Sequence, residues 1–148
     1  MSSRDDLLGR MSLARAELET IVTALRGRED VDLGEGWRVR DLIAHLALWE
    51  RVAAWKLGGA DIPNAEGLVG RDPWDVNAFN EEMRERWRDR PLSEVMAEFN
   101  AAHVALVEII SNASEADCAP GGLARAAIDG DGAGHYAQHL SELRSAMF

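Results

Sequence analysis

The sequence predicts an all-α protein, a four-helix bundle with an additional short helix in the connection between helices 2 and 3. Apolar residues recur at steps of three and four over four long segments, the period of a helix with one buried face. No segment alternates apolar and polar residues as a half-buried strand would. At 148 residues the chain is expected to form one domain over 1–148, large enough to bury a core without disulfides.

The first two bundle helices are predicted within the first 57 residues. One follows an N-cap at Ser2 or Ser3 and stops near Gly27, and the other spans about 39–57, where two glycines end it. The apolar stripe of the second helix includes His45. This imidazole is therefore expected on or beside the inward face.

A long loop is predicted after the second helix, over residues 60–71. Asp72 and Pro73 then form an N-cap followed by proline in the first turn, which opens the short connecting helix. After Pro91 the third bundle helix carries an apolar stripe that includes His103.

The last helix is expected over about 133–147, after a stretch at 111–134 that is rich in Gly, Ala and Asp and predicted to be loop or short irregular structure. His135 and His139 lie four residues apart, so on a helix both rings leave the same face. Ligands in four-helix bundles project from facing helices, so these two rings and His45 are expected to meet.

Three imidazoles in one place suit a transition metal. Neutral imidazole is a favoured ligand of zinc, nickel, copper and iron. Three protein ligands leave coordination positions open for water or substrate, which is typical of a catalytic site.

Charge and cysteine content narrow the function classes. Acidic residues outnumber basic ones 26 to 16, and the formal charge of −10 argues against nucleic acid or an anionic membrane as partner. The one cysteine, Cys118, cannot form an internal disulfide and is interpreted as an inert small residue. The start of the chain lacks the apolar core of a signal peptide, and no apolar run is long enough to span a membrane, so a cytoplasmic location is expected.

Two motifs suggest a family. The segment GWRVRDLIAHL (36–46) leads into the second helix, and His135-x-x-x-His139 lies in the last one. They resemble the DinB-like superfamily of bacterial four-helix bundles, which includes thiol-dependent maleylpyruvate isomerases and bacillithiol S-transferases. The resemblance covers nearly the whole chain. Within the superfamily, DVNAFN (75–80) and the H-Y-x-x-H ending look most similar to the ClbS/DfsB group.

The resemblance implies a divalent metal, zinc or nickel, held by His45, His135 and His139, and a low-molecular-weight thiol as co-substrate. It favours a metal-dependent enzyme that acts on a small electrophilic molecule as a thiol S-transferase, isomerase or hydrolase in detoxification. The alternative is a non-catalytic protein of the self-resistance type that binds and sequesters a small molecule. A homodimer is compatible with the sequence, since relatives often pair through helices.

Other residues receive supporting roles around the metal. Metal-bound imidazoles usually donate their other N–H to a carboxylate or carbonyl, and Asp41, Gln138 and Glu142 are near enough in sequence to accept. Solvated positions on the helix surface are the alternative for each. Arg38 stands where many relatives have a Ser or Thr N-cap, so Asp41 is also expected to support the helix start through the helix dipole.

The substrate pocket is expected to include Trp49, Asn77 and Asn80, although helix-surface amides are the default for the two asparagines. His103 is the candidate for a nearby acid/base group, against the simpler interpretation of a core or boundary histidine. Tyr136 is the candidate donor to a substrate oxygen, against packing with its hydroxyl at the rim.

Overall fold

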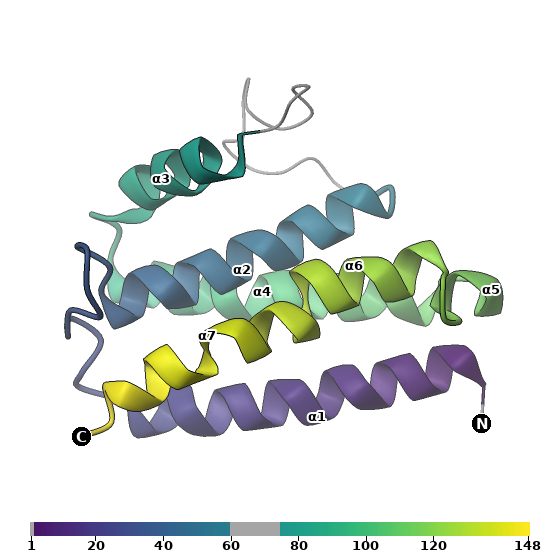
Figure 1. Cartoon of the computed structure of the whole chain (residues 1–148), viewed down its shortest axis with the longest axis horizontal. Coiled ribbons are helices and arrows are strands. Elements are labelled where there is room, and N and C mark those ends of the chain that lie inside the picture. The colour runs from purple at the N-terminus through teal and green to yellow at the C-terminus, as the bar shows by residue number, and fades with distance from the viewer. Residues whose placement is uncertain (1, 60–74) are drawn as a thin grey trace.

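The computed structural model describes residues 2–59 and 75–148, and it confirms the predicted helical bundle (Figure 1). Within these ranges the chain forms helices and no strand, apart from an isolated bridge between Asp32 and Arg38. Two short helices, α3 and α5, accompany the bundle helices. The elements are α1 (Ser3–Ala24), α2 (Val39–Lys56), α3 (Val76–Trp87), α4 (Leu92–Ser111), α5 (Glu115–Cys118), α6 (Leu123–Asp131) and α7 (Ala133–Ser145).

The N-terminal ends of α1 and α2 are held by different caps. The Ser2 hydroxyl accepts a hydrogen bond from the Asp5 amide at 3.1 Å, a standard N-cap. At α2 the carboxylate of Asp41 accepts from the Arg38 backbone amide at 2.9 Å and from the Arg38 guanidinium at 2.8 and 2.9 Å. Asp41 thus replaces the missing hydroxyl by direct hydrogen bonds. Burial alone would raise the pKa of Asp41, but the bonds from Arg38 outweigh it and lower that pKa.

The short connecting helix α3 packs on the outside of α2. Its N-cap is Asp75, whose side chain accepts from the Ala78 amide at 3.0 Å. The predicted opening at Asp72 and Pro73 lies outside the described residues. Apolar side chains of α2 and α3 form a separate cluster beside the bundle core, made of Leu48, Trp49, Val52, Phe79 and Met83.

The prediction of loop or short irregular structure over 111–134 is wrong, because this stretch contains α5 and α6. Ala124, Ala127 and Ile128 are buried at helical spacing and pack in a cluster with residues of α1, α2 and α4. Glycine and aspartate make α6 a weak helix by propensity, so burial of this small apolar face stabilises it. α6 continues nearly in line with α7, and together they form the fourth rod of the bundle (Figure 1).

The junction of α6 and α7 depends on a close backbone approach. Gly132 separates the two helices, as the C-cap of α6 and the N-cap of α7. A Cβ added to the next glycine, Gly134, would lie 1.8 Å from the carbonyl oxygen of Asp129. Only a residue without a side chain fits at this position. The junction sets where α7 begins, and therefore where His135 lies.

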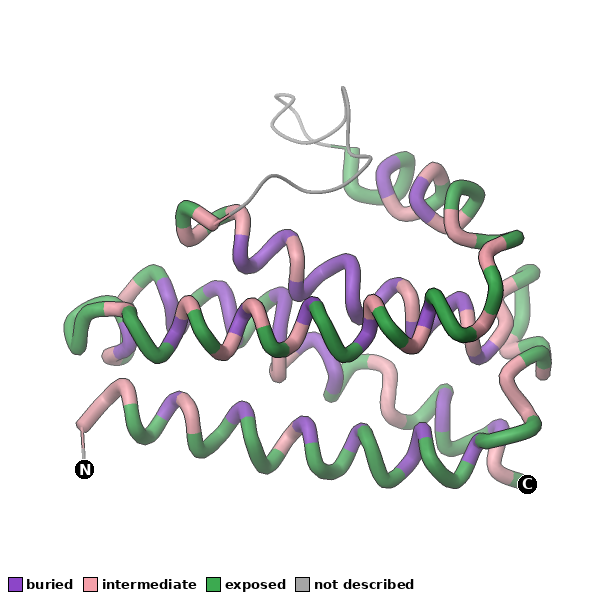
Figure 2. Tube along the Cα trace, turned by 180° about the vertical axis from the view of Figure 1, so that it is seen from behind, coloured by how far each residue is buried: buried purple, intermediate pink, exposed green. Residues whose placement is uncertain are grey.

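The core centres on α2, because α3, α4, α6 and α7 all pack on it. Figure 2 shows buried residues recurring along each bundle helix and dense on α2. Among the described residues, no helix is long and apolar enough to cross a membrane.

Substitution of Gly134 by alanine is expected to lower the free energy of unfolding by about 1–3 kcal/mol, because the added methyl group forces the α6–α7 junction apart. Gly130 is the matched control: an added Cβ meets nothing within 4 Å there, so alanine should be neutral or stabilise α6 by up to about 1 kcal/mol. Urea unfolding followed by circular dichroism measures both variants. Equal stability of Gly134→Ala and the wild type would contradict the close approach.

Candidate metal centre

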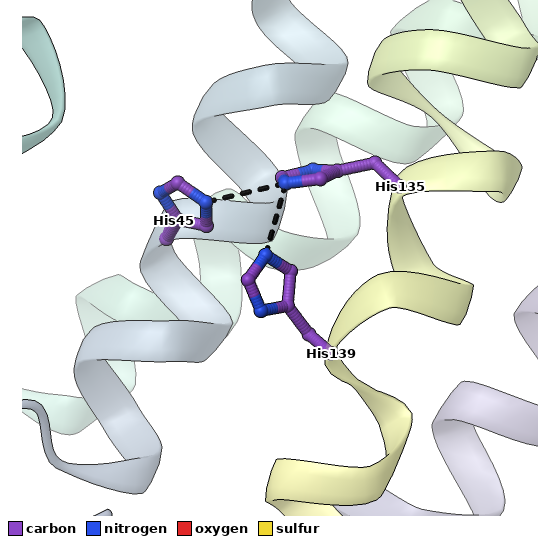
Figure 3. Close-up of side chains that lie close together, drawn as sticks. All are labelled: His45, His135 and His139. Atoms are coloured by element: carbon purple, nitrogen blue, oxygen red, sulfur yellow. Dashed lines mark hydrogen bonds between the residues drawn. The ribbon is translucent and has the colours of Figure 1, made fainter. Parts of the chain in front are cut away.

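Three imidazoles from two helices converge at one point. His45 comes from the middle of α2, and His135 and His139 come from the first two turns of α7. The Nε2 atoms of His45 and His135 are 3.3 Å apart, and those of His135 and His139 are 3.1 Å apart (Figure 3). One ring nitrogen from each residue lies within 4.8 Å of the others.

These separations fit a shared metal ion. Zinc binds imidazole nitrogen at about 2.0–2.1 Å, so two ligands at a tetrahedral angle lie about 3.4 Å apart. The measured Nε2 separations of 3.3 and 3.1 Å are close to that value. Two of the three separations therefore already suit a shared ion, and the nitrogens of the third pair, His45 and His139, lie within 4.8 Å of each other.

The hydrogen-bond needs of the rings are not met by the protein. The Nε2 atom of His135 faces two other Nε2 atoms, and a neutral imidazole nitrogen has one proton or one lone pair to offer. The Nδ1 atoms of His45 and His135 are buried and have no hydrogen-bond partner among the described residues. The three Nε2 atoms that crowd together, rather than the Nδ1 atoms on the far side of the rings, therefore point to a bound ion at the cluster.

Electrostatics keep the two buried rings neutral. Burial, together with the neighbouring His135 and His139, lowers the pKa of His45 to about 3. Burial and the neighbouring His139 lower the pKa of His135 to about 4. Desolvation disfavours the charged imidazolium, so both lone pairs are available at neutral pH without displacing a proton.

Of the three residues expected to accept a hydrogen bond from a ligand histidine, one does so in the structure. Glu142 Oε1 lies 2.9 Å from Nδ1 of His139, one turn further along α7, so it orients that ring with Nε2 toward the cluster. Gln138 is exposed on α7. Asp41 is buried, but its carboxylate binds Arg38 rather than a histidine.

A pocket of about 450 Å³ opens beside the histidines. Asn80 of α3 lies in its wall and accepts from the Trp49 indole N–H at 3.0 Å. Asn77, the other asparagine expected here, is exposed and does not line this pocket. The described lining residues are Leu33, Gly34, Glu35, Trp37, Leu42, His45, Asn80, His139 and Glu142.

Two tryptophans contact the buried imidazoles. Trp49 lies edge-on to His45 and His135, with ring centroids 6.3 and 5.9 Å apart. Trp37 lies closer, 5.5 Å from the His45 ring, and sequence reasoning missed it as a pocket residue. It precedes α2 in a turn, where helical periodicity gives no sign of side-chain direction.

Tyr136 and His103 meet at a different place, around Glu50 of α2. The Glu50 carboxylate accepts from the Tyr136 hydroxyl at 2.5 Å and lies 2.8 Å from Nδ1 of His103. Arg15 of α1 completes the group, with its guanidinium 3.2 Å from Glu50. Burial first, and then the charge of Glu50, raise the pKa of Tyr136 above its ordinary value, so the phenol keeps its proton.

Sequence reasoning missed Arg15 and Glu50. Each is a charged residue on the apolar stripe of a long helix, and the two charges are opposite. Full burial of Glu50, at 0 % exposed, requires such partners. Opposite charges on two apolar stripes were the signal that could have found the pair.

Comparison with known proteins identifies the family. Residues 11–143 match the family described as the mycothiol maleylpyruvate isomerase N-terminal domain, which is a DinB-like domain. No curated protein and no solved structure shows a significant match. The likeness to the ClbS/DfsB group rests on short motifs and stays a prediction. The match spans most of the chain, which therefore belongs to the mycothiol maleylpyruvate isomerase N-terminal domain family of the DinB-like superfamily.

Proposed function

We propose that the chain is a divalent-metal-dependent enzyme that uses a low-molecular-weight thiol on a small electrophilic molecule. The observation that carries this proposal is the convergence of His45, His135 and His139 beside an open pocket. Zinc and nickel both suit three imidazoles. The family description, which names mycothiol, supports a thiol as co-substrate.

The residues of the cluster divide the work of holding an ion. His45 and His135 offer neutral, buried nitrogens, and His139 is oriented by Glu142. Three protein ligands would leave a coordination position for water or substrate. When bound there, a divalent ion supplies Lewis acidity, which lowers the pKa of a coordinated water or thiol.

The pocket wall offers contacts for the second reactant. Asn80 uses its side-chain oxygen to accept from Trp49, which leaves its amide N–H groups to donate to a ligand. Trp37 adds an aromatic surface beside His45. These groups orient a small polar molecule next to the ion, which is the main contribution that positioning makes to a transfer reaction.

Removal of one imidazole is expected to abolish tight metal binding. His45→Ala and His139→Ala should each lower the affinity for Zn²⁺ by more than about 100-fold, since loss of an outer-shell partner alone costs about 10–100-fold. Titration calorimetry on protein purified without a histidine tag measures the affinity, and elemental analysis measures the metal content.

The fourth histidine provides the matched control for this experiment. His103 contacts Glu50 and not the cluster, so His103→Gln should keep wild-type Zn²⁺ affinity. Absence of stoichiometric metal in the wild type, with unchanged affinity in His45→Ala and His139→Ala, would refute a metal centre at these residues.

The metal-free protein is expected to lose stability in mild acid. The pKa values of His45 and His135 are lower in the folded chain than the ordinary 6.5 of an unfolded one, so the unfolded state binds more protons below pH 6.5. The stabilisation is complete above pH 6.5 and is lost as pH falls toward 4. Each ring should lower the free energy of unfolding by about 2 kcal/mol between pH 7 and pH 5.

Urea unfolding at the two pH values measures this loss. His45→Gln removes one of the two titrating rings, so its stability should fall by about half as much as that of the wild type over the same pH range. A free energy of unfolding that is equal at pH 7 and pH 5 would show that the rings are not held neutral by burial.

Turnover is expected to require both metal and thiol. Zn²⁺-loaded protein is assayed with mycothiol, bacillithiol and glutathione against a panel of small electrophiles, with His139→Ala as the metal-deficient control. The proposal expects product only with a thiol and only in the wild type. Hydrolysis at full rate without thiol would exclude the thiol-dependent reaction, and stoichiometric metal without any turnover would favour a sequestering protein.

A further inference from the structure

The turn before α2 holds an acidic side chain in a disfavoured backbone conformation. The turn closes through hydrogen bonds from the Leu33 amide to the Trp37 carbonyl at 2.6 Å and from the Trp37 amide to the Gly34 carbonyl at 3.0 Å. Within it, Glu35 has φ +56°, and it is the one non-glycine residue with positive φ in the described ranges. Backbone strain of this kind concentrates at functional sites, so the position of the Glu35 side chain is of interest.

Glu35 lines the pocket beside the histidine cluster. The charged side chains among the described lining residues are Glu35 and Glu142, both acidic. The guanidinium of Arg84 stacks on Trp37 at 5.0 Å and is bonded to Glu81 at 2.6 Å. It lines a neighbouring water-sized cavity, which shares Trp37, His45 and Asn80 with this pocket, and its charge is paired with Glu81.

The pocket that Glu35 lines also borders the histidine cluster, through His45 and His139. His45 is nine-tenths buried, lines the pocket, and has an Nδ1 atom without a partner among the described residues. Because Glu35 and these histidines line one pocket, the charge of Glu35 acts on a molecule that binds in it beside the histidines. Glu35 is exposed, so solvent and salt partly screen its charge, and the expected effect is a several-fold preference.

We infer that Glu35 selects the charge of the ligand: the pocket favours a molecule with an ammonium group and rejects one with a free carboxylate. This inference rests on the proposed function and adds the substrate class. An ammonium group gains from a charge-assisted hydrogen bond with the Glu35 carboxylate. An acid of the maleylpyruvate type, which the family description names, would bring two carboxylates toward Glu35 and Glu142.

The test uses three thiols that differ only in the distant end group: 6-aminohexane-1-thiol, 6-mercaptohexan-1-ol and 6-mercaptohexanoic acid. The six-carbon chain is too long to close a small chelate ring, so each offers the metal the same sulfur. Co²⁺ replaces Zn²⁺, and the sulfur-to-cobalt absorption band reports the dissociation constant of each thiol. We expect the ammonium thiol to bind at least about 5-fold more tightly than the carboxylate thiol, with the alcohol between them.

Variants assign this preference to Glu35. In Glu35→Gln the preference should fall below about 2-fold, and in Glu35→Lys the order should reverse. Glu108→Gln is the matched control, because it makes the same change in net charge at an exposed position of α4 outside the pocket and should keep the wild-type preference. In the wild type, 0.5 M NaCl should weaken the preference by screening.

The outcomes separate this inference from the proposed function. Failure of Co²⁺ to bind the wild type would overturn both. Binding of Co²⁺ with equal affinities for the three thiols, or with the carboxylate thiol preferred, would overturn the role of Glu35 alone. An unchanged preference in a folded, Co²⁺-binding Glu35→Gln protein would do the same.

Discussion

The buried carboxylate of Glu50 is the constraint on which the arrangement of the bundle depends. A carboxylate removed from water needs hydrogen-bond partners, and those of Glu50 come from the other three bundle helices: Arg15 of α1, His103 of α4 and Tyr136 of α7. Apolar packing has no direction and tolerates sliding of one helix along another, whereas these bonds specify one register. Tyr136 directly follows His135, so the same bonds hold the imidazole-bearing turn of α7 against α2.

Helical periodicity was enough to predict the bundle and the meeting of the three imidazoles. A strong apolar stripe with a glycine stop placed the second helix at 39–57, against Val39–Lys56 in the structure. A spacing of four residues puts His135 and His139 on one face of any helix, whatever the tertiary structure. The stripe position of His45 then needed only a facing helix, which the bundle provides.

Other features depend on tertiary contacts that a local pattern does not contain. Arg15 and Glu50 lie 35 residues apart in sequence, and they meet across the core because α4 and α7 each pack against both α1 and α2. The helix at 123–131 has weak propensity and exists because its small apolar face is buried. Tyr136 was expected near substrate. It follows His135 by one residue, a step that rotates its side chain by about 100° around the helix, toward the core. Trp37 reaches the pocket through a turn whose path the sequence does not reveal.

The separation of the imidazoles along the chain has a topological consequence. His45 and His135 are 90 residues apart, and an ion bound to both would close a loop of that length. Closing a long loop removes entropy from the unfolded chain, as a disulfide does. A chain with one cysteine has no internal disulfide available, so coordination would take over that role. The metal centre would then cross-link α7 to α2 in the middle of the chain. Docking of α7 and completion of the metal site would become one event, so folding and metal binding would be coupled.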